Sequence, residues 1–221
     1  MSTTADIDRT AERFSRAVER RSTYHYVVSK LRRDPATRAI AELGPLGDVL
    51  DLGCGRGHLA LYLLESGVAK SVRAYDWDEK KIALARRASE GLDASFHAID
   101  VRKAEAEPAD TVLLVDVLHY LDVATQDTLL ARAADLVRPG GRLVVRDATA
   151  GSGWRSFLTL FVEWVSLLIR FNLGEKIALR DMTRDVVPVL EKKGLRCTVS
   201  PCWRGTPFAN VLVVGHKLTD S

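Results

Sequence analysis

Val49-Leu50-Asp51-Leu52-Gly53-Cys54-Gly55-Arg56-Gly57 is the stretch that decides the fold of this chain. An apolar run ends in a carboxylate, a glycine-rich turn follows, and residues 58–66 (HLALYLLES) have the composition of a helix. The stretch therefore predicts a strand, a tight turn and the start of a helix. Glycines in such a turn have no Cβ, so the backbone can bend sharply and come close to a ligand. The helix that follows directs unpaired N–H groups at that ligand.

The carboxylate of Asp51 indicates which kind of ligand the turn receives. From Gly55 onward the sequence also fits G-x-G-x-x-A, a pattern found in dinucleotide-binding loops. A carboxylate at the mouth of the loop would repel a pyrophosphate. It suits a ligand that carries an ammonium group and no phosphate, such as the methionine part of S-adenosylmethionine.

The same nine residues resemble motif I of the class I S-adenosylmethionine-dependent methyltransferases, which is written hydrophobic-D-x-G-x-G-x-G. The resemblance covers about residues 35–217, through weaker motifs beyond the first. It implies a Rossmann-like α/β fold with a doubly wound, mostly parallel seven-stranded sheet and a terminal antiparallel hairpin. It also implies S-adenosylmethionine as the cofactor, bound in part by Asp51, Gly53, Cys54 and Gly55.

Strand-like and helix-like segments alternate through residue 146, a pattern that predicts a parallel, doubly wound sheet. The strands are expected at residues 48–52, 71–75, 94–99, 111–117 and 142–146, and the R-P-G-G turn at 138–141 is typical of the family. A helix is expected over 183–193. Residues 195–203 and 210–217 then predict two strands that should be antiparallel, because a parallel crossover needs a dozen or more residues.

Carboxylates that follow the second and third strands are expected to bind the nucleoside. Asp76 can accept hydrogen bonds from both ribose hydroxyls, and the alternative is that it caps the next helix, although Asp78 is the better cap. Trp77 offers a broad face for the adenine ring. In the resembled family, an acidic residue in the place of Asp100 meets the adenine amine, and the next backbone N–H, here that of Val101, meets a ring nitrogen.

The fourth strand carries one carboxylate, Asp116, in an otherwise apolar run. A charge in such a run needs a partner or a function, and the end of a central strand faces the ligand crevice. We therefore expect Asp116 at the cofactor site.

His119, three residues on, is the candidate catalytic residue. An oxygen nucleophile must lose its proton, and histidine is suited to remove it. The string Val117-Leu118-His119 is similar to the site of small-molecule O-methyltransferases, in which the histidine is the base. Packing beside the cofactor and orienting the substrate are the alternatives. Asp147, after the fifth strand, either contacts substrate or is neutralised by Arg146.

The N-terminal arm is basic. Residues 1–33 contain eight Lys or Arg and four Asp or Glu, whereas the whole chain has a net charge of +3. This charge is compatible with an anionic partner but too small to indicate nucleic acid. Residues 5–22 have helical spacing and form either a cap over the cofactor or a frayed terminus. Tyr26 and Lys30 are candidates for contacts with the methionine carboxylate or the substrate, and surface or packing roles are the alternative.

Two parts are expected: a helical cap or arm over residues 1–34, and a methyltransferase domain over 35–217 with an apolar helical insertion at 154–173. The insertion is apolar over so much of its circumference that more than one side must be covered. Charged residues interrupt it, so a membrane span is not expected. It can wall a pocket for a hydrophobic substrate, pack in a homodimer, or touch a membrane surface as a peripheral contact.

Composition fits one globular domain, since 47% of the 221 residues are hydrophobic and 28% are charged. Three cysteines without a C-x-x-C pair, and an N-terminus without an apolar core, lead us to expect a cytoplasmic location. The histidines are scattered and make no metal constellation. Nucleic acid is not an expected substrate, because the chain has Asp116-Val117-Leu118-His119 where amino-directed enzymes carry N/D-P-P-Y/F.

The expected function is methyl transfer from S-adenosylmethionine to the oxygen or carbon of a small, lipophilic or aromatic metabolite, free or tethered to a carrier. A macromolecular methyltransferase acting on RNA or protein is one alternative. A cofactor-binding partner subunit without catalysis is another. An oxidoreductase is the least favoured.

Overall fold

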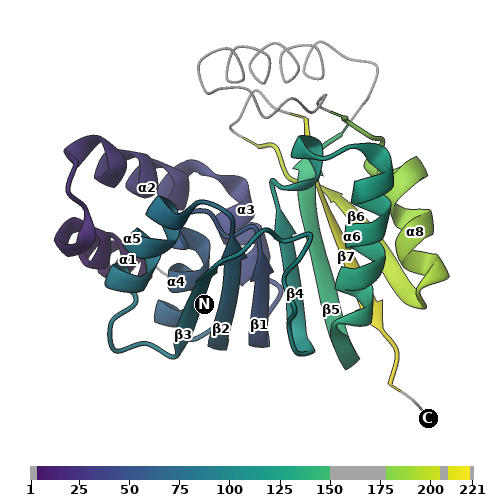
Figure 1. The fold of residues 1–221 in the computed structure, drawn as a ribbon, viewed down its shortest axis with the longest axis horizontal. Helices are drawn as coiled ribbons and strands as arrows, with labels where there is room; N and C mark the ends of the chain where they lie inside the picture. The colour runs from purple at the N-terminus through teal and green to yellow at the C-terminus, as the bar shows by residue number, and fades with distance from the viewer. Residues whose placement is uncertain (1–3, 150–177, 205–208, 220–221) are drawn as a thin grey trace.

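A seven-stranded sheet forms the centre of the molecule, and its strand order is β3-β2-β1-β4-β5-β7-β6 (Figure 1). In the computed structural model, which describes residues 4–149, 178–204 and 209–219, β1 to β5 pair in parallel and β7 pairs antiparallel with β5 and β6. The predicted doubly wound sheet with a terminal antiparallel pair is confirmed. The strands are β1 (Gly47–Leu52), β2 (Ala69–Asp76), β3 (Ala94–Ala98), β4 (Ala109–Val115), β5 (Val137–Ala148), β6 (Leu195–Pro201) and β7 (Asn210–Lys217).

Helices cover both faces of this sheet, because alternate residues of each strand point to opposite sides. On β5, Val144 joins one hydrophobic cluster, whereas Leu143 and Val145 join the other. The first cluster includes side chains of α1 (Thr4–Ala17), α2 (Arg21–Arg33), α3 (Pro35–Ala41), α4 (His58–Glu65) and α5 (Glu79–Ala88). The second includes side chains of the 3₁₀ turn η1 (Leu118–Tyr120), α6 (Val123–Asp135), the π-turn η2 (Met182–Val186) and α8 (Val187–Lys192).

The predicted strand–turn–helix unit is β1, the glycine loop and α4. Gly53 has a φ of +96°, and a Cβ there would lie 2.3 Å from a methyl group of Val117. Gly57 has a φ of +71°, and its Cβ would lie 2.6 Å from the Phe96 ring. Because both positions combine a left-handed backbone with no free space, glycine is required by packing as well as by the turn.

The N-terminal arm is two helices, and the helical spacing seen over residues 5–22 is interrupted between them. The chain leaves α1 after Ala17 and begins α2 at Arg21, with Arg20 in an extended conformation. The break lets the chain turn so that Phe14 of α1 and Val27 and Leu31 of α2 are buried in one cluster with side chains of α4. Such burial excludes a frayed terminus.

Several element boundaries differ from the sequence-based predictions, among them those of β4, β5 and the expected 183–193 helix. β4 ends at Val115, and Asp116 has a φ of +57°, so the predicted last two residues of that strand leave it. β5 begins at Val137 and includes residues 138–141, which were expected to form a turn. The register of β5 against β4 shifts here, so these residues stay in the strand although the register pairs none of them with a residue of β4. The expected 183–193 helix is divided into η2 and α8 near Pro188, which has no N–H to donate to the preceding turn.

The apolar segment 154–173 lies outside the described residues, so its three possible roles stay predictions. Among the helices that the structure describes, none has the length and apolarity needed to cross a membrane.

Candidate active site

The carboxyl ends of β1, β2, β4 and β5 meet at one edge of the sheet, where open α/β folds bind their ligands. Four of the carboxylates that the sequence singled out lie in or directly after these strand ends, and they are Asp51, Asp76, Asp116 and Asp147. The fold therefore gathers most of the candidate site residues along one edge of the sheet.

Asp51 is a buried carboxylate, with 2% of its surface exposed. Burial, followed by the nearby negative charge of Asp76, raises the pKa of Asp51 to about 7. In the described parts of the chain, no hydrogen-bond donor reaches this carboxylate. A cationic group of a ligand would supply the missing partner.

Asp76 joins the end of β2 to the glycine loop. Its Oδ2 accepts a hydrogen bond from Gly55 N at 2.8 Å, and its Oδ1 accepts one from Asp78 N at 2.9 Å. The cap of α5 is Asp78, which accepts from the backbone N–H groups of Lys80 and Lys81. The alternative that Asp76 is the helix cap is therefore wrong.

Trp77, which follows β2, presents an exposed ring, with 62% of its surface accessible and Lys81 Nζ 5.7 Å from the ring centre. The neighbouring candidate, Asp100, is held by Arg102, whose Nη2 donates to it at 2.6 Å. Hydrogen bonds from Arg102 lower the pKa of Asp100 and keep it ionised. An adenine amine at Asp100 must therefore share this carboxylate with Arg102. Val101 is buried.

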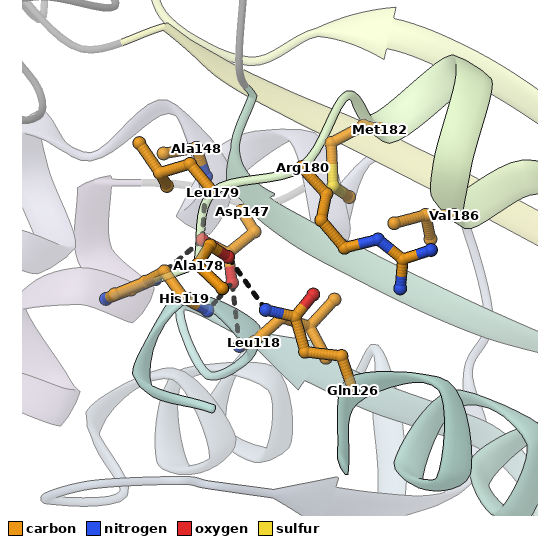
Figure 2. Close-up of a pocket in the computed structure, with 10 residues that line it drawn as sticks. All are labelled: Leu118, His119, Gln126, Asp147, Ala148, Ala178, Leu179, Arg180, Met182 and Val186. Carbon is orange, nitrogen blue, oxygen red and sulfur yellow. Dashed lines mark hydrogen bonds and ion pairs between the residues drawn. The ribbon is translucent and has the colours of Figure 1, made fainter. Parts of the chain in front are cut away.

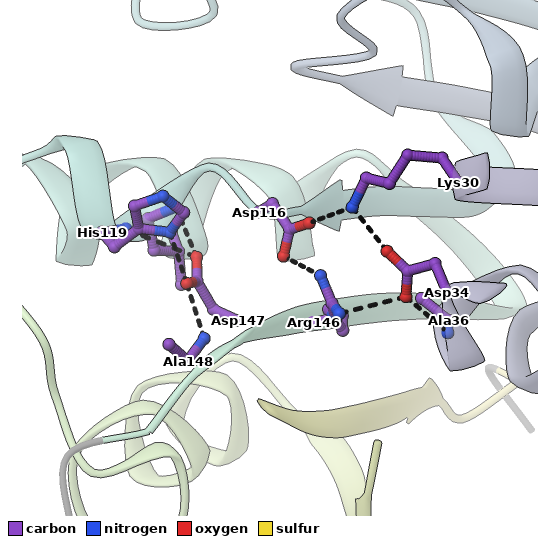
Figure 3. A network of polar contacts seen from close by, with 9 residues as sticks. Lys30, Asp34, Ala36, Asp116, His119, Arg146, Asp147 and Ala148 are labelled. Carbon is purple, nitrogen blue, oxygen red and sulfur yellow. Dashed lines mark hydrogen bonds and ion pairs between the residues drawn. The ribbon is translucent and has the colours of Figure 1, made fainter. Parts of the chain in front are cut away.

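Lys30 and Asp116 contact each other, although 86 residues separate them in the chain. Lys30 Nζ lies 3.6 Å from Asp116 Oδ2 and donates a hydrogen bond to Asp34 Oδ2 at 2.5 Å (Figure 3). Arg146 donates to the other oxygen of Asp116 and, at 3.1 Å, to Asp34. The two candidate cofactor contacts are thus already parts of one ion-pair network.

The ring of His119 is paired with Asp147 (Figure 2). Its Nδ1 lies 2.6 Å from Asp147 Oδ1, and both side chains are buried. The carboxylate also accepts from the backbone N–H groups of Leu118 at 2.8 Å and Ala148 at 2.7 Å. Burial alone would raise the pKa of Asp147, but His119, the N–H of Ala148 and the charge of Arg146 lower it. The carboxylate is therefore ionised at neutral pH.

A small recess beside this pair is closed by the chain that returns to the sheet at residues 178–182. It has a volume of about 10 Å³, enough for one water molecule, and its lining includes Leu118, Gln126, Met182 and Val186. Gln126 Nε2 donates to Leu121 O and Ala178 O, which fastens the returning chain to α6. On this side of the His119–Asp147 pair, the described residues therefore leave space for about one water molecule.

Residues 49–141 match a methyltransferase domain family. The chain is 35% identical over 123 residues to the ubiquinone biosynthesis O-methyltransferase of Caulobacter vibrioides. The aligned region covers 53% of this chain and 46% of that relative. It is 34% identical over 99 residues to a trans-aconitate 2-methyltransferase of Mycobacterium tuberculosis, and this aligned region covers 44% of this chain and 36% of the relative. The aligned region thus spans less than half the length of these curated relatives.

Solved methyltransferase structures have the same fold. One is the putative methyltransferase of Haloferax volcanii in complex with the Trm112 activator, with a TM-score of 0.69, 16% identity and coverage of 89% of this chain and 94% of that one. Another is the N-methyltransferase NodS of Bradyrhizobium japonicum in complex with S-adenosylhomocysteine, with a TM-score of 0.62, 18% identity and coverage of 94% and 98%. Residues 49–141 are thus a methyltransferase domain, and the chain has the fold of these solved methyltransferases.

One side-chain pair at this site was not predicted from the sequence, and one alternative for Asp147 differs from the structure. Neutralisation by Arg146 was one of the two alternatives for Asp147, yet Arg146 binds Asp116 and Asp34, and Asp147 binds His119. The reason is strand alternation, which directs consecutive residues of β5 to opposite faces of the sheet. His119 follows β4 and Asp147 lies near the end of β5, and the parallel pairing of these two strands, which no local pattern encodes, brings the two side chains together.

Proposed function

We propose that this methyltransferase transfers the methyl group of S-adenosylmethionine to the oxygen of a small, neutral, lipophilic or aromatic hydroxyl compound, with His119 as the general base. The observation that carries the proposal is the hydrogen bond of 2.6 Å between His119 Nδ1 and the Asp147 carboxylate. A buried carboxylate that fixes a histidine ring is the arrangement by which proteins orient a catalytic base.

The hydrogen-bond network determines which ring nitrogen is basic. Asp147 is ionised and accepts from Leu118 N and Ala148 N, so it has no proton to give to the ring. Nδ1 of His119 must therefore carry the hydrogen and donate it to Asp147. Nε2 is then the nitrogen that takes the proton of the acceptor hydroxyl.

Charge pairing favours a neutral acceptor over a carboxylic acid. A carboxylate acceptor has already lost its proton and needs a cation rather than a base. At this edge of the sheet, Lys30 and Arg146 are ion-paired with Asp34 and Asp116, and Arg180 is ion-paired with Asp127. A phenol or enol fits a buried histidine base better, and an acidic carbon is the alternative nucleophile.

The residues of the crevice fit the cofactor. Asp51 is a buried carboxylate that lacks a donor and suits the ammonium group of the methionine part. Asp76 can accept from the ribose, Trp77 can cover the adenine, and Gly53, Cys54 and Gly55 bring backbone close to the ligand. When bound, S-adenosylmethionine supplies an electrophilic methyl group. The protein then has to orient the acceptor and remove its proton.

The test incubates the purified full chain with methyl-labelled S-adenosylmethionine and separate small-molecule, protein and RNA fractions of a cell extract. We expect label in a small molecule as an O-methyl group. Label in protein or RNA would instead support a macromolecular methyltransferase. Cofactor binding without any transfer would support a partner subunit that lacks catalysis.

A further inference from the structure

Four charged side chains form a closed ring of ion pairs close to the His119–Asp147 pair (Figure 3). Lys30 contacts Asp34 and Asp116, and Arg146 contacts the same two carboxylates. Arg146 has 3% of its surface exposed. A buried guanidinium requires such partners, because an unpaired charge is costly away from water. We call this set, Lys30, Asp34, Asp116 and Arg146, the charge ring.

The charge ring joins the N-terminal arm to the centre of the sheet. Lys30 lies in α2, and Asp34 is the residue between α2 and α3, where its carboxylate caps α3 by accepting from Ala36 N. Asp116 follows β4, and Arg146 belongs to β5. Contacts of the ring therefore link two helices of one layer to the ends of two central strands.

Asp116 is the member of the ring that leads to the proposed base. Its φ is +57°, and among the described residues no other non-glycine residue has a positive φ. Its backbone N–H donates to Arg146 O at 2.8 Å, and its carboxylate is held by Arg146 and Lys30. η1, which carries His119, begins two residues later. The direction of the chain into His119 thus depends on an uncommon conformation that the ring maintains.

β5 holds the same segment from both faces of the sheet. Arg146 shares its face with Val144 and the N-terminal helices, whereas Asp147 shares its face with Val145 and α6. Arg146 holds Asp116, while Asp147 holds the ring of His119 and Leu118 N. Two consecutive residues therefore fix the segment 116–119 at its start and at its end.

We propose that Lys30 and Arg146 are positioning residues for His119, which act by holding Asp116 in the turn that aims the histidine at the acceptor. The N-terminal arm is then a part of the catalytic unit rather than only a cover over the cofactor. This inference rests on the proposed role of His119 as base.

The test compares Lys30→Met, Arg146→Met and the conservative Lys30→Arg in the full chain. Lys193→Met is the matched control, because it removes a lysine that pairs with Asp135 on the surface. The nuclear magnetic resonance signals of the His119 ring are recorded without cofactor, so that a lost cofactor contact does not contribute. We expect both Met variants to shift these signals, Lys30→Arg to restore them, and Lys193→Met to leave them unchanged.

Turnover at saturating cofactor gives the second readout. We expect kcat to fall roughly 10- to 100-fold in Lys30→Met, with a smaller change in KM for the acceptor, as for a misplaced catalytic group. If Arg146→Met does not fold, the inference is tested by Lys30→Met alone, because Lys30 is partly exposed. Unchanged His119 signals in folded Lys30→Met overturn the inference. Absence of methyl transfer in the parent overturns the proposed function, and the ring signals still decide the positioning role.

Discussion

At the scale of the residue, two buried carboxylates at the same sheet edge have opposite properties. Asp51 and Asp147 are each 2% exposed. Asp147 is surrounded by donors, which outweigh burial and lower its pKa, whereas burial and Asp76 raise the pKa of Asp51 to about 7. The satisfied carboxylate fixes a side chain, and the unsatisfied one is available to a ligand.

Asp51→Asn should stabilise the cofactor-free protein at alkaline pH. With a pKa near 7 in the folded state, above its unfolded value, Asp51 ionises less readily when folded, so its contribution to stability falls as the pH rises from about 4 to 7. We expect the free energy of unfolding of the variant, relative to the parent, to increase by on the order of 3 kcal/mol between pH 5 and pH 8. Urea unfolding at both pH values measures it.

Asp93→Asn is the matched control for this change, because Asp93 is exposed. Its stability relative to the parent should be nearly the same at both pH values. Affinity for S-adenosylhomocysteine should fall in Asp51→Asn and stay unchanged in the control. A pH-independent stability difference for Asp51→Asn would contradict the assigned environment of this carboxylate.

His119→Ala should reduce turnover by on the order of 100- to 10,000-fold, the usual effect of removing a general base. Binding of S-adenosylhomocysteine should remain, since the Ala variant keeps the glycine loop and Asp51. His216→Ala changes an exposed histidine on β7 and serves as the control. Initial rates with the identified acceptor and calorimetric binding measure the two effects. Parental turnover in His119→Ala would exclude the base role.

At the scale of the element, the predictions from sequence succeeded where the cause is local. The apolar run and glycines at residues 49–57 predicted β1 and its loop, and Asp78 was identified as the cap of α5. The break between α1 and α2 was missed, since it depends on the packing of Phe14 and Val27 in a distant core. The His119–Asp147 pair was missed because it depends on the pairing of β4 with β5, which no local pattern encodes.

Gly53→Ala tests how β1, the glycine loop and the turn after β4 fit together. The new Cβ would meet Val117 at 2.3 Å, and the φ of +96° is strained for alanine. Gly91→Ala is the control, since it has a φ of +77° and nothing within 4 Å of its Cβ. Gly53→Ala should therefore lose roughly 1–3 kcal/mol more stability than Gly91→Ala, by denaturant unfolding. Equal losses would show that the loop relaxes freely away from Val117.

At the scale of the whole molecule, the arm and the site are connected through the sheet. The arm contributes Phe14, Val27 and Leu31 to the core on one face, and the charge ring joins that face to the ends of β4 and β5. On the other face, α6 and the chain at 178–182 close the recess beside His119. The residues that position the proposed base thus come from both helical layers.

Phe14→Ala should show that the arm is part of the folding unit. The side chain is fully buried, and its loss leaves a cavity between α1 and the helices beneath it, which should cost about 3–5 kcal/mol of unfolding free energy. Ser15→Ala, an exposed position of the same helix, should change stability by less than about 0.5 kcal/mol. Urea unfolding followed by circular dichroism measures both variants. A small loss in Phe14→Ala, with faster amide exchange confined to α1 and α2, would instead mean that the arm unfolds separately, and the charge ring would then couple a detachable element to the site.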